Sequence, residues 1–160
     1  MRCGLALLLS ALSVAACRGP QPDEGSSTNP DSEATEPSCS GDYDVFEVGM
    51  TKLTEPEEIA IALEAAEPSP PAVRDDNVWT LRLRDATGEP LTGAALQVSP
   101  YMPAHQHGSA EVIIEELGDG GYQLSAIQLI MPGVWEMPIV VTPAGGEPSE
   151  AAFRLCIVEE

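Results

Sequence analysis

The sequence predicts an all-β domain, a β-sandwich of seven to eight short antiparallel strands. From about residue 43, apolar residues alternate with polar or small residues, and this period of two is typical of strands with one buried face. Gly-, Pro- and Asp-rich runs separate the alternating stretches, and helical spacing is not convincing anywhere after the first 16 residues. The domain has about 115 residues, enough for one modest core.

Six stretches carry the alternation. Their predicted inward-facing residues are Ile59, Ile61 and Leu63; Trp79, Leu81 and Leu83; Val112 and Ile114; Tyr122, Leu124 and Ala126; Trp135, Met137, Ile139 and Val141; and Phe153, Leu155 and Ile157. The predicted turns between them are residues 68–71, 85–90, 118–121 and 144–148. Gly and Asp in these turns accept positive φ angles, and Pro ends strand pairing.

The first 16 residues resemble an export signal. Arg2 supplies a positive charge, and the apolar run over residues 5–16 is too short for a bilayer core, which needs about 20 residues. The run ends in Val14-Ala-Ala-Cys17, which resembles the lipobox of bacterial lipoproteins, so we expect Cys17 to be lipidated. The alternative is an ordinary signal peptide with an incidental cysteine. Because Arg18 follows instead of Asp, the outer membrane is the expected address within the cell envelope.

Residues 17–40 form a predicted acidic linker between this anchor and the domain, which we place at residues 41–160. The stretch from residue 18 onward contains no aromatic or large aliphatic residue. Such a stretch cannot bury enough apolar area to offset the entropy lost on ordering, so we expect a flexible tether.

The remaining cysteines predict one disulfide. Cys3 leaves with the signal and Cys17 is used by the lipid, so Cys39 and Cys156 remain as a pair in an oxidising compartment. Cys156 falls on the outer face of its strand, which suits a bridge over the outside of the sheet. Two free thiols acting as metal ligands are the alternative.

The charge excludes some partners. Seven Lys and Arg stand against 26 Asp and Glu, which gives a formal net charge of −19. Such a charge repels nucleic acid and anionic lipid headgroups. The membrane contact that we expect is therefore the lipid at Cys17, and a nucleic-acid partner is not expected.

The residues with the most chemistry lie in two short stretches, Tyr101-Met-Pro-Ala-His-Gln-His-Gly108 and Met131-Pro-Gly-Val-Trp135. Both histidines of the chain, His105 and His107, lie in the first. In an extended segment, residues two apart project to the same side, so the two imidazoles can share a ligand. Met102 needs a bend at Pro103 to join them, and Met131 must come from a neighbouring loop.

Imidazole and thioether form a soft donor set that selects copper, especially Cu(I), over Mg²⁺ or Ca²⁺. We therefore predict a copper site of Met102, His105, His107 and Met131. Zinc is an alternative that prefers further cysteine, carboxylate or histidine ligands, and Glu111 could supply one. In a third interpretation no metal binds: the methionines fill one end of the sandwich and the histidines form an exposed loop.

The sequence predicts a non-enzyme. It contains no Gly-x-Ser-x-Gly elbow and no Gly-rich phosphate loop, and no thiol remains free beside a histidine. Ser109 lies near His107, but no positioned acid is apparent.

The span from about Thr80 to Val141 resembles the YtkA-like family, which is related to FixH-type domains of bacterial envelope proteins. The matching segments are residues 85–94, 101–108, 120–122 and 131–135. The resemblance implies an immunoglobulin-like sandwich outside the cytoplasm, near heavy-metal handling or oxidase maturation. Met102, His105, His107 and Met131 fall on the family's Met and His positions, whereas Gln106 stands where relatives often have Gly.

Two functions follow as expectations. In the first, a lipid-anchored envelope protein binds copper at one end of its sandwich and buffers it or passes it to a copper-handling envelope partner. In the second, the same domain is a structural or protein-interaction module that binds no metal.

Overall fold

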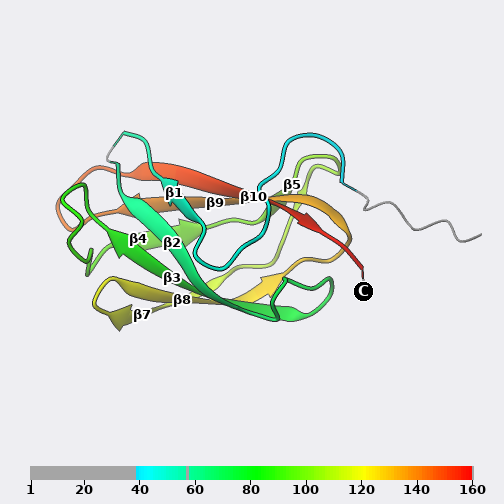
Figure 1. The fold of residues 1–160 in the computed structure, drawn as a ribbon, viewed down its shortest axis with the longest axis horizontal. Helices are drawn as coiled ribbons and strands as arrows, with labels where there is room; N and C mark the ends of the chain where they lie inside the picture. Colours follow the sequence, from blue (N-terminus) through cyan, green and yellow to red (C-terminus); the bar gives the residue numbers. More distant parts are fainter. Residues whose placement is uncertain (1–38, 57, 160) are drawn as a thin grey trace, which may run out of the picture. The chain divides into compact units, whose positions relative to one another are not determined.

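Two antiparallel sheets pack face to face in the computed structural model, which describes residues 39–56 and 58–159 (Figure 1). The described residues belong to one unit, residues 34–160. The predicted signal peptide, Cys17 and all of the predicted linker except residues 39–40 lie outside the described residues. Within the described part of the chain, no helix is long and apolar enough to cross a membrane.

The first sheet has five strands in the order β1-β2-β3-β8-β7. They are β1 (Thr51–Leu53), β2 (Ala60–Glu67), β3 (Asp76–Arg84), β8 (Gly121–Gln128) and β7 (Ile113–Gly118). The second sheet has the order β10-β9-β5-β6, and β4 also pairs with β9. Its strands are β10 (Ser149–Ile157), β9 (Gly133–Thr142), β5 (Tyr101–Met102), β6 (His107–Gly108) and β4 (Ala95–Val98).

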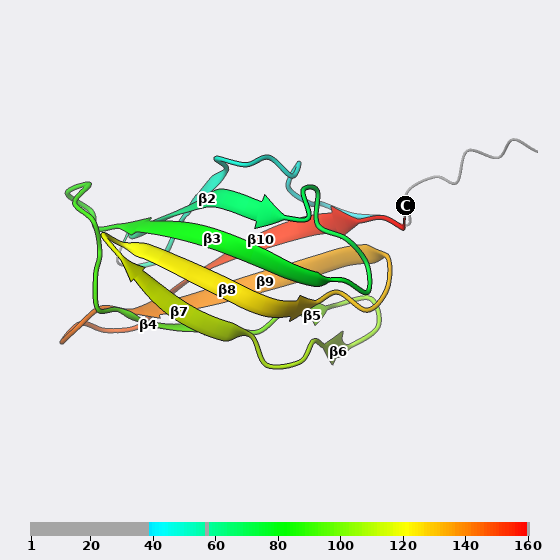
Figure 2. The ribbon, with the colours of Figure 1, turned by 90° about the horizontal axis from the view of Figure 1, so that it is seen from below.

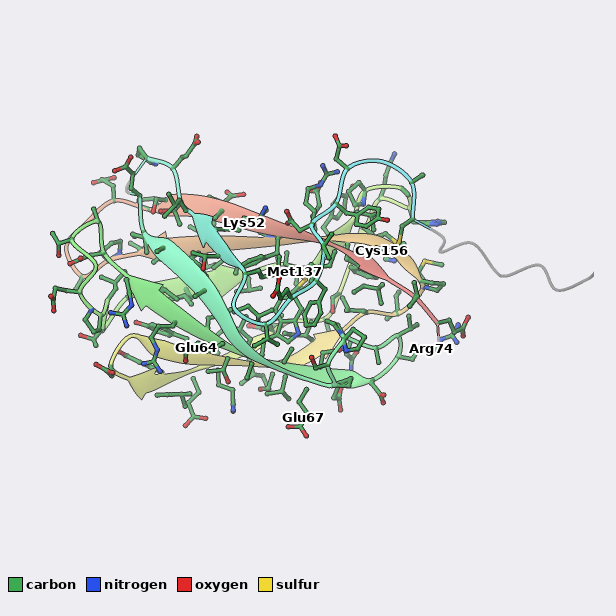
Figure 3. The ribbon with its side chains drawn as sticks, viewed as in Figure 1. Lys52, Glu64, Glu67, Arg74, Met137 and Cys156 are labelled. Atoms are coloured by element: carbon green, nitrogen blue, oxygen red, sulfur yellow. A yellow bond between two sulfur atoms is a disulfide. The ribbon has the colours of Figure 1, made fainter. Side chains whose placement is uncertain are left out.

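The predicted all-β sandwich is confirmed. The structure has ten strands where seven to eight were predicted, because the first sheet includes the three-residue β1 and the second includes the two-residue β5 and β6. Side chains such as Met137 fill the space between the sheets, whereas Glu64 and Glu67 point outward (Figure 3). The predicted alternation agrees with the observed burial on β2, β3, β9 and β10.

One predicted inward-facing residue was wrong. Ala126 is only half-buried and has a φ of 58°, and the pairing of β3 with β8 shifts register there. This bulge adds one residue to β8, so burial moves from the even-numbered Tyr122 and Leu124 to Ile127 and Leu129.

One long side of the sandwich is closed by the chain itself. Glu55 pairs with Glu150 across the two sheets, and Asp44 pairs with Leu155 in the segment that precedes β1. Phe46 and Met50 of that segment pack against the core. Burial raises the pKa of Asp44, but hydrogen bonds from the Arg154 amide and the Lys52 ammonium outweigh it and leave the pKa lowered.

The predicted disulfide is present between Cys39 and Cys156, so these residues are not free thiols. Cys156 is half-buried between the buried Leu155 and Ile157, as expected for the outer face of β10. The bridge closes a loop with a sequence separation of 117, which in the chain-entropy model stabilises the fold by about 4–5 kcal/mol. It joins the segment that precedes β1 to the last strand, β10.

Candidate metal centre

The two histidines lie on a short hairpin made of β5 and β6. Met102 pairs with His107, and Tyr101 pairs with Gly108. Residues 103–106 form the turn, in which the amides of His105 and Gln106 donate to the carbonyl of Met102 at 3.2 and 2.9 Å. Figure 2 shows this hairpin at the same end of the sandwich as the β8–β9 connection.

The hairpin turn explains the residue at position 106. Gln106 has a φ of 54°, in the left-handed region that glycine adopts without a steric penalty. Gln106 therefore adopts this turn conformation at a cost of about 1 kcal/mol.

Pro138 explains why the hairpin separates from the strand before it. β4 pairs with β9 up to Val98–Ile139, and pairing resumes at Tyr101–Glu136. Between these pairs, the carbonyl of Pro138 accepts a 3.4 Å hydrogen bond from the amide of Ser99. The backbone nitrogen and carbonyl of one strand residue point to the same side of the strand. The nitrogen of Pro138, which carries no hydrogen, therefore also points toward Ser99, and the second hydrogen bond of this pair cannot form. The ladder is interrupted there, and β5 begins a separate hairpin.

Met102 and His107 are direct neighbours. Met102 is buried, with 1% of its surface exposed. Because paired residues on adjacent antiparallel strands project to the same face, the His107 ring lies on the same side of the sheet as Met102. The Nε2 atom of His107 is buried and has no hydrogen-bond partner among the described residues. Buried polar atoms are rarely left unpaired, because the missing bond costs about 1–3 kcal/mol.

His105 supplies the exposed side of the centre. Its side chain is exposed on the turn, and its ring centroid lies 5.9 Å from that of His107. A metal bound at about 2.0 Å from an imidazole nitrogen lies about 3.2 Å from the ring centroid. The centroid distance of 5.9 Å is shorter than twice this value, so the ring separation itself does not prevent one ion from reaching both rings.

Trp135 connects Met131 to this hairpin. The indole Nε1–H donates to the carbonyl of Met131 at 3.0 Å, and the His107 ring packs edge-on against the same indole at 5.6 Å. The Ser109 hydroxyl also accepts a hydrogen bond from the amide of Gln128, at the end of β8. Met131 is half-buried and packs against the core. Its loop and the hairpin thus meet at one buried ring.

The structure places Met102, His105 and His107 on one hairpin, and it places the backbone of Met131 against the indole that the His107 ring contacts. The segment with the two histidines is a turn and not an extended strand, so the argument from residues two apart was wrong, although the rings do lie close. Glu111, the alternative zinc ligand, is exposed and lines a groove between β4 and β7. Ser109 binds the backbone at Gln128, a structural role.

Pro138 was not recognised as part of the candidate site, and the contacts of Trp135 were not predicted. Trp135 was assigned mainly to the core, and it is fully buried, but it also touches both site segments. A proline inside an alternating run could have indicated the break in pairing.

The four candidates include two thioethers. Among residues 39–56 and 58–159, no group of three or more His, Cys, Asp or Glu side chains is placed to hold a metal ion. The candidate set is of another kind, since Met102 and Met131 would supply half of its donors. This composition fits a soft ion.

A model of the YtkA-like family matches residues 53–140, which is more than half of the chain and includes all four candidates. The chain belongs to the YtkA-like family. The match starts well before Thr80, so it also includes all of β2 and β3. It leaves out Cys39 and Cys156, so the disulfide lies outside the matched part of this YtkA-like chain.

Comparisons with curated proteins and with solved structures add little to this family assignment. No curated protein matches the chain. Among solved structures, FetP from uropathogenic E. coli strain F11 matches with a TM-score of 0.49 and 12% sequence identity. The match covers 71% of this chain and 95% of that chain.

The unpaired Nε2 of His107 predicts an unusual response to mutation. Changing His107→Phe in the metal-free protein should leave the free energy of unfolding unchanged or raise it by up to about 1 kcal/mol, because a buried unpaired atom is removed. Trp135→Phe should lower it by about 2 kcal/mol or more, because the Met131 carbonyl loses its donor and the smaller ring leaves a cavity in the core. Urea unfolding of both variants measures this. A clear loss of stability in His107→Phe would mean that Nε2 has a partner.

Proposed function

We propose that this YtkA-like protein is a lipid-anchored, extracytoplasmic copper-binding protein that buffers copper or transfers it to another envelope protein. Met102, His105, His107 and Met131 are the proposed ligands. The observation that carries the proposal is the Nε2 atom of His107, which is buried and has no hydrogen-bond partner among the described residues. His107 pairs with Met102, and its ring centroid lies 5.9 Å from that of the exposed His105.

The arrangement supports copper by its donor chemistry. Thioether and neutral imidazole are ligands that Cu(I) prefers, whereas Mg²⁺ and Ca²⁺ require oxygen donors. Buried Met102 offers an inner ligand and exposed His105 an outer one, so an ion can enter from solvent and exchange with a partner. No enzymatic activity is proposed, because the sequence contains no Gly-x-Ser-x-Gly elbow and no Gly-rich phosphate loop.

The location of the protein is proposed from the sequence. Residues 1–16 direct export, lipid on Cys17 anchors the chain, and residues 18–40 give the domain reach from the membrane. The disulfide between Cys39 and Cys156 is consistent with an oxidising compartment.

Copper binding is testable with conservative variants. The purified full chain should bind one Cu(I) per molecule, measured by competition with a chromophoric Cu(I) chelator. The double variant Met102→Leu/Met131→Leu keeps apolar volume but removes both thioethers, so it should weaken binding about tenfold or more. Binding should also weaken from pH 7 to about pH 5, since protonated imidazole cannot ligate a metal.

The matched control is Met50→Leu/Met137→Leu, which removes two thioethers outside the candidate centre. Met50 matches Met131, since both are half-buried, and Met137 matches Met102, since both are buried. The control should bind Cu(I) as the unmodified chain does. Equal binding by both double variants, or Zn²⁺ binding that ignores the thioethers, would contradict the proposal.

The anchor has its own test. In the bacterium, Cys17→Ser should move the protein from the membrane fraction to the soluble extracytoplasmic fraction, because the thiol that accepts the lipid is gone. Fractionation followed by immunoblotting measures this, with Cys3→Ser as the control that stays in the membrane. Unchanged membrane attachment of Cys17→Ser would argue against lipidation at this residue.

A further inference from the structure

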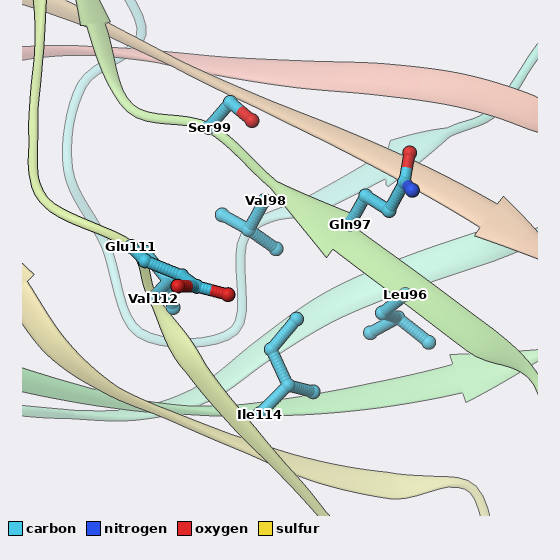
Figure 4. A pocket seen from close by; sticks show the side chains of 7 residues that line it. All are labelled: Leu96, Gln97, Val98, Ser99, Glu111, Val112 and Ile114. Atoms are coloured by element: carbon cyan, nitrogen blue, oxygen red, sulfur yellow. The ribbon is translucent and has the colours of Figure 1, made fainter.

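The two long sides of the sandwich differ. The side next to β1 and β10 is closed by the Glu55–Glu150 and Asp44–Leu155 pairs. The opposite side lies between β4 and β7, and no backbone pairing between these strands occurs in the described structure. A groove of about 440 Å³ opens here (Figure 4). Its apolar lining is Leu96 and Val98 on one side and Val112 and Ile114 on the other, and its polar lining is Gln97, Ser99 and Glu111.

The groove is bordered by two strand edges. β4 pairs only with β9 and β7 only with β8, so within residues 39–56 and 58–159 one edge of each strand has no partner. An unpaired edge presents a row of N–H and C=O groups to any extended chain. Neither β4 nor β7 contains Lys or Pro, the residues that commonly protect an edge.

The two ends of the groove are defined. At one end the Glu116 carboxylate accepts a hydrogen bond from the amide of Gly93 at 2.7 Å, and the Tyr122 hydroxyl accepts one from Ala94. These contacts hold β4 and the first sheet at a fixed spacing. At the other end, Ser99 and Glu111 lead into the β5–β6 hairpin.

The outer face of β7 is unusually apolar for an exposed strand. Ile113 is 62% exposed and Leu117 is 53% exposed, and Glu115 lies between them in the alternation. A strand added to the edge of β7 would place every second side chain beside these three residues. Its remaining side chains would enter the groove. Lysine suits the outer positions, because its apolar stem covers Ile113 and Leu117 while its ammonium meets Glu115.

Charge also selects a basic occupant. The chain from residue 85 to residue 153 contains no Lys or Arg, so every formal charge on β4, β7 and their connection is negative. Glu111 and Glu115 are both exposed on this side. A second copy of the chain would bring the same acidic edge, and residues 18–38 of its own linker are acidic and lack large apolar residues. Both occupants are therefore disfavoured.

We propose that the β4–β7 groove binds an extended, basic segment of a partner protein, which adds a strand to the edge of β7. Its alternate apolar side chains fill the space between Leu96 and Ile114, and its Lys or Arg side chains pair with Glu111 and Glu115. This proposal is independent of copper, although the docked segment would end beside the candidate metal centre.

A direct test uses a synthetic peptide. A dye-labelled, end-blocked octapeptide of alternating valine and lysine should bind the purified full chain one to one, followed by fluorescence anisotropy at low salt. Backbone amide NMR signals of residues 95–98 and 111–116 should shift. The Glu111→Lys/Glu115→Lys variant should bind about tenfold more weakly, and the peptide N-methylated on alternate residues along the edge that pairs should lose binding, because strand addition needs its N–H groups.

The control variant Glu47→Lys/Glu67→Lys changes the net charge equally on exposed residues outside the groove and should bind as the unmodified chain does. Equal weakening in both variants would overturn the proposal in favour of diffuse charge attraction. Undiminished binding of the N-methylated peptide would overturn strand addition. A dimer in sedimentation analysis that the groove variant disrupts would assign the groove to a second copy instead.

Discussion

Trp135 is the residue on which the candidate centre depends. Its indole is fully buried, donates to the Met131 carbonyl and supports the edge of the His107 ring. Two segments separated by more than 20 residues in the chain are therefore positioned by one rigid side chain. Trp135 lies on β9, an inner strand of the second sheet, and pairs with Leu155 on β10. The position of the indole is therefore fixed by the sheet and not by a loop. Sites built on strands hold their geometry better than sites built on loops alone.

β9 organises the rest of the molecule around that point. It pairs with β10 along its full length on one side, and with β4 and then β5 on the other. Pro138 interrupts the second ladder, and the chain uses the interruption to form the β5–β6 hairpin. The same interruption ends β4 after four residues, so both the β5–β6 hairpin and the strand that borders the groove are positioned by β9.

Much of the fold could be predicted from the sequence because burial on one face of a strand leaves a period of two. The runs ending in Leu63, Leu83, Val141 and Ile157 show this pattern without irregularity. Ala126 broke it, since a bulge changes which residues face inward without changing their composition. The pairing order of the strands was not predictable, because it depends on contacts between distant segments. The disulfide followed from counting the cysteines that remain once residues 1–17 are assigned to an export signal and a lipid anchor.

The candidate site was chosen by residue composition, and its geometry was not predicted. Four donors were chosen by residue type, whereas the turn over residues 103–106 and the role of Trp135 required three-dimensional contacts. The groove had no sequence signal of its own, since Leu96 and Ile114 belong to different sheets.

X-ray absorption at the copper edge of the Cu(I)-loaded full chain tests the central claim most directly. The proposed ligands predict a mixed first shell, with nitrogen at about 2.0 Å and sulfur at about 2.3 Å from the metal. A first shell of nitrogen and oxygen alone would show that the thioethers of Met102 and Met131 do not bind copper, and would contradict the account.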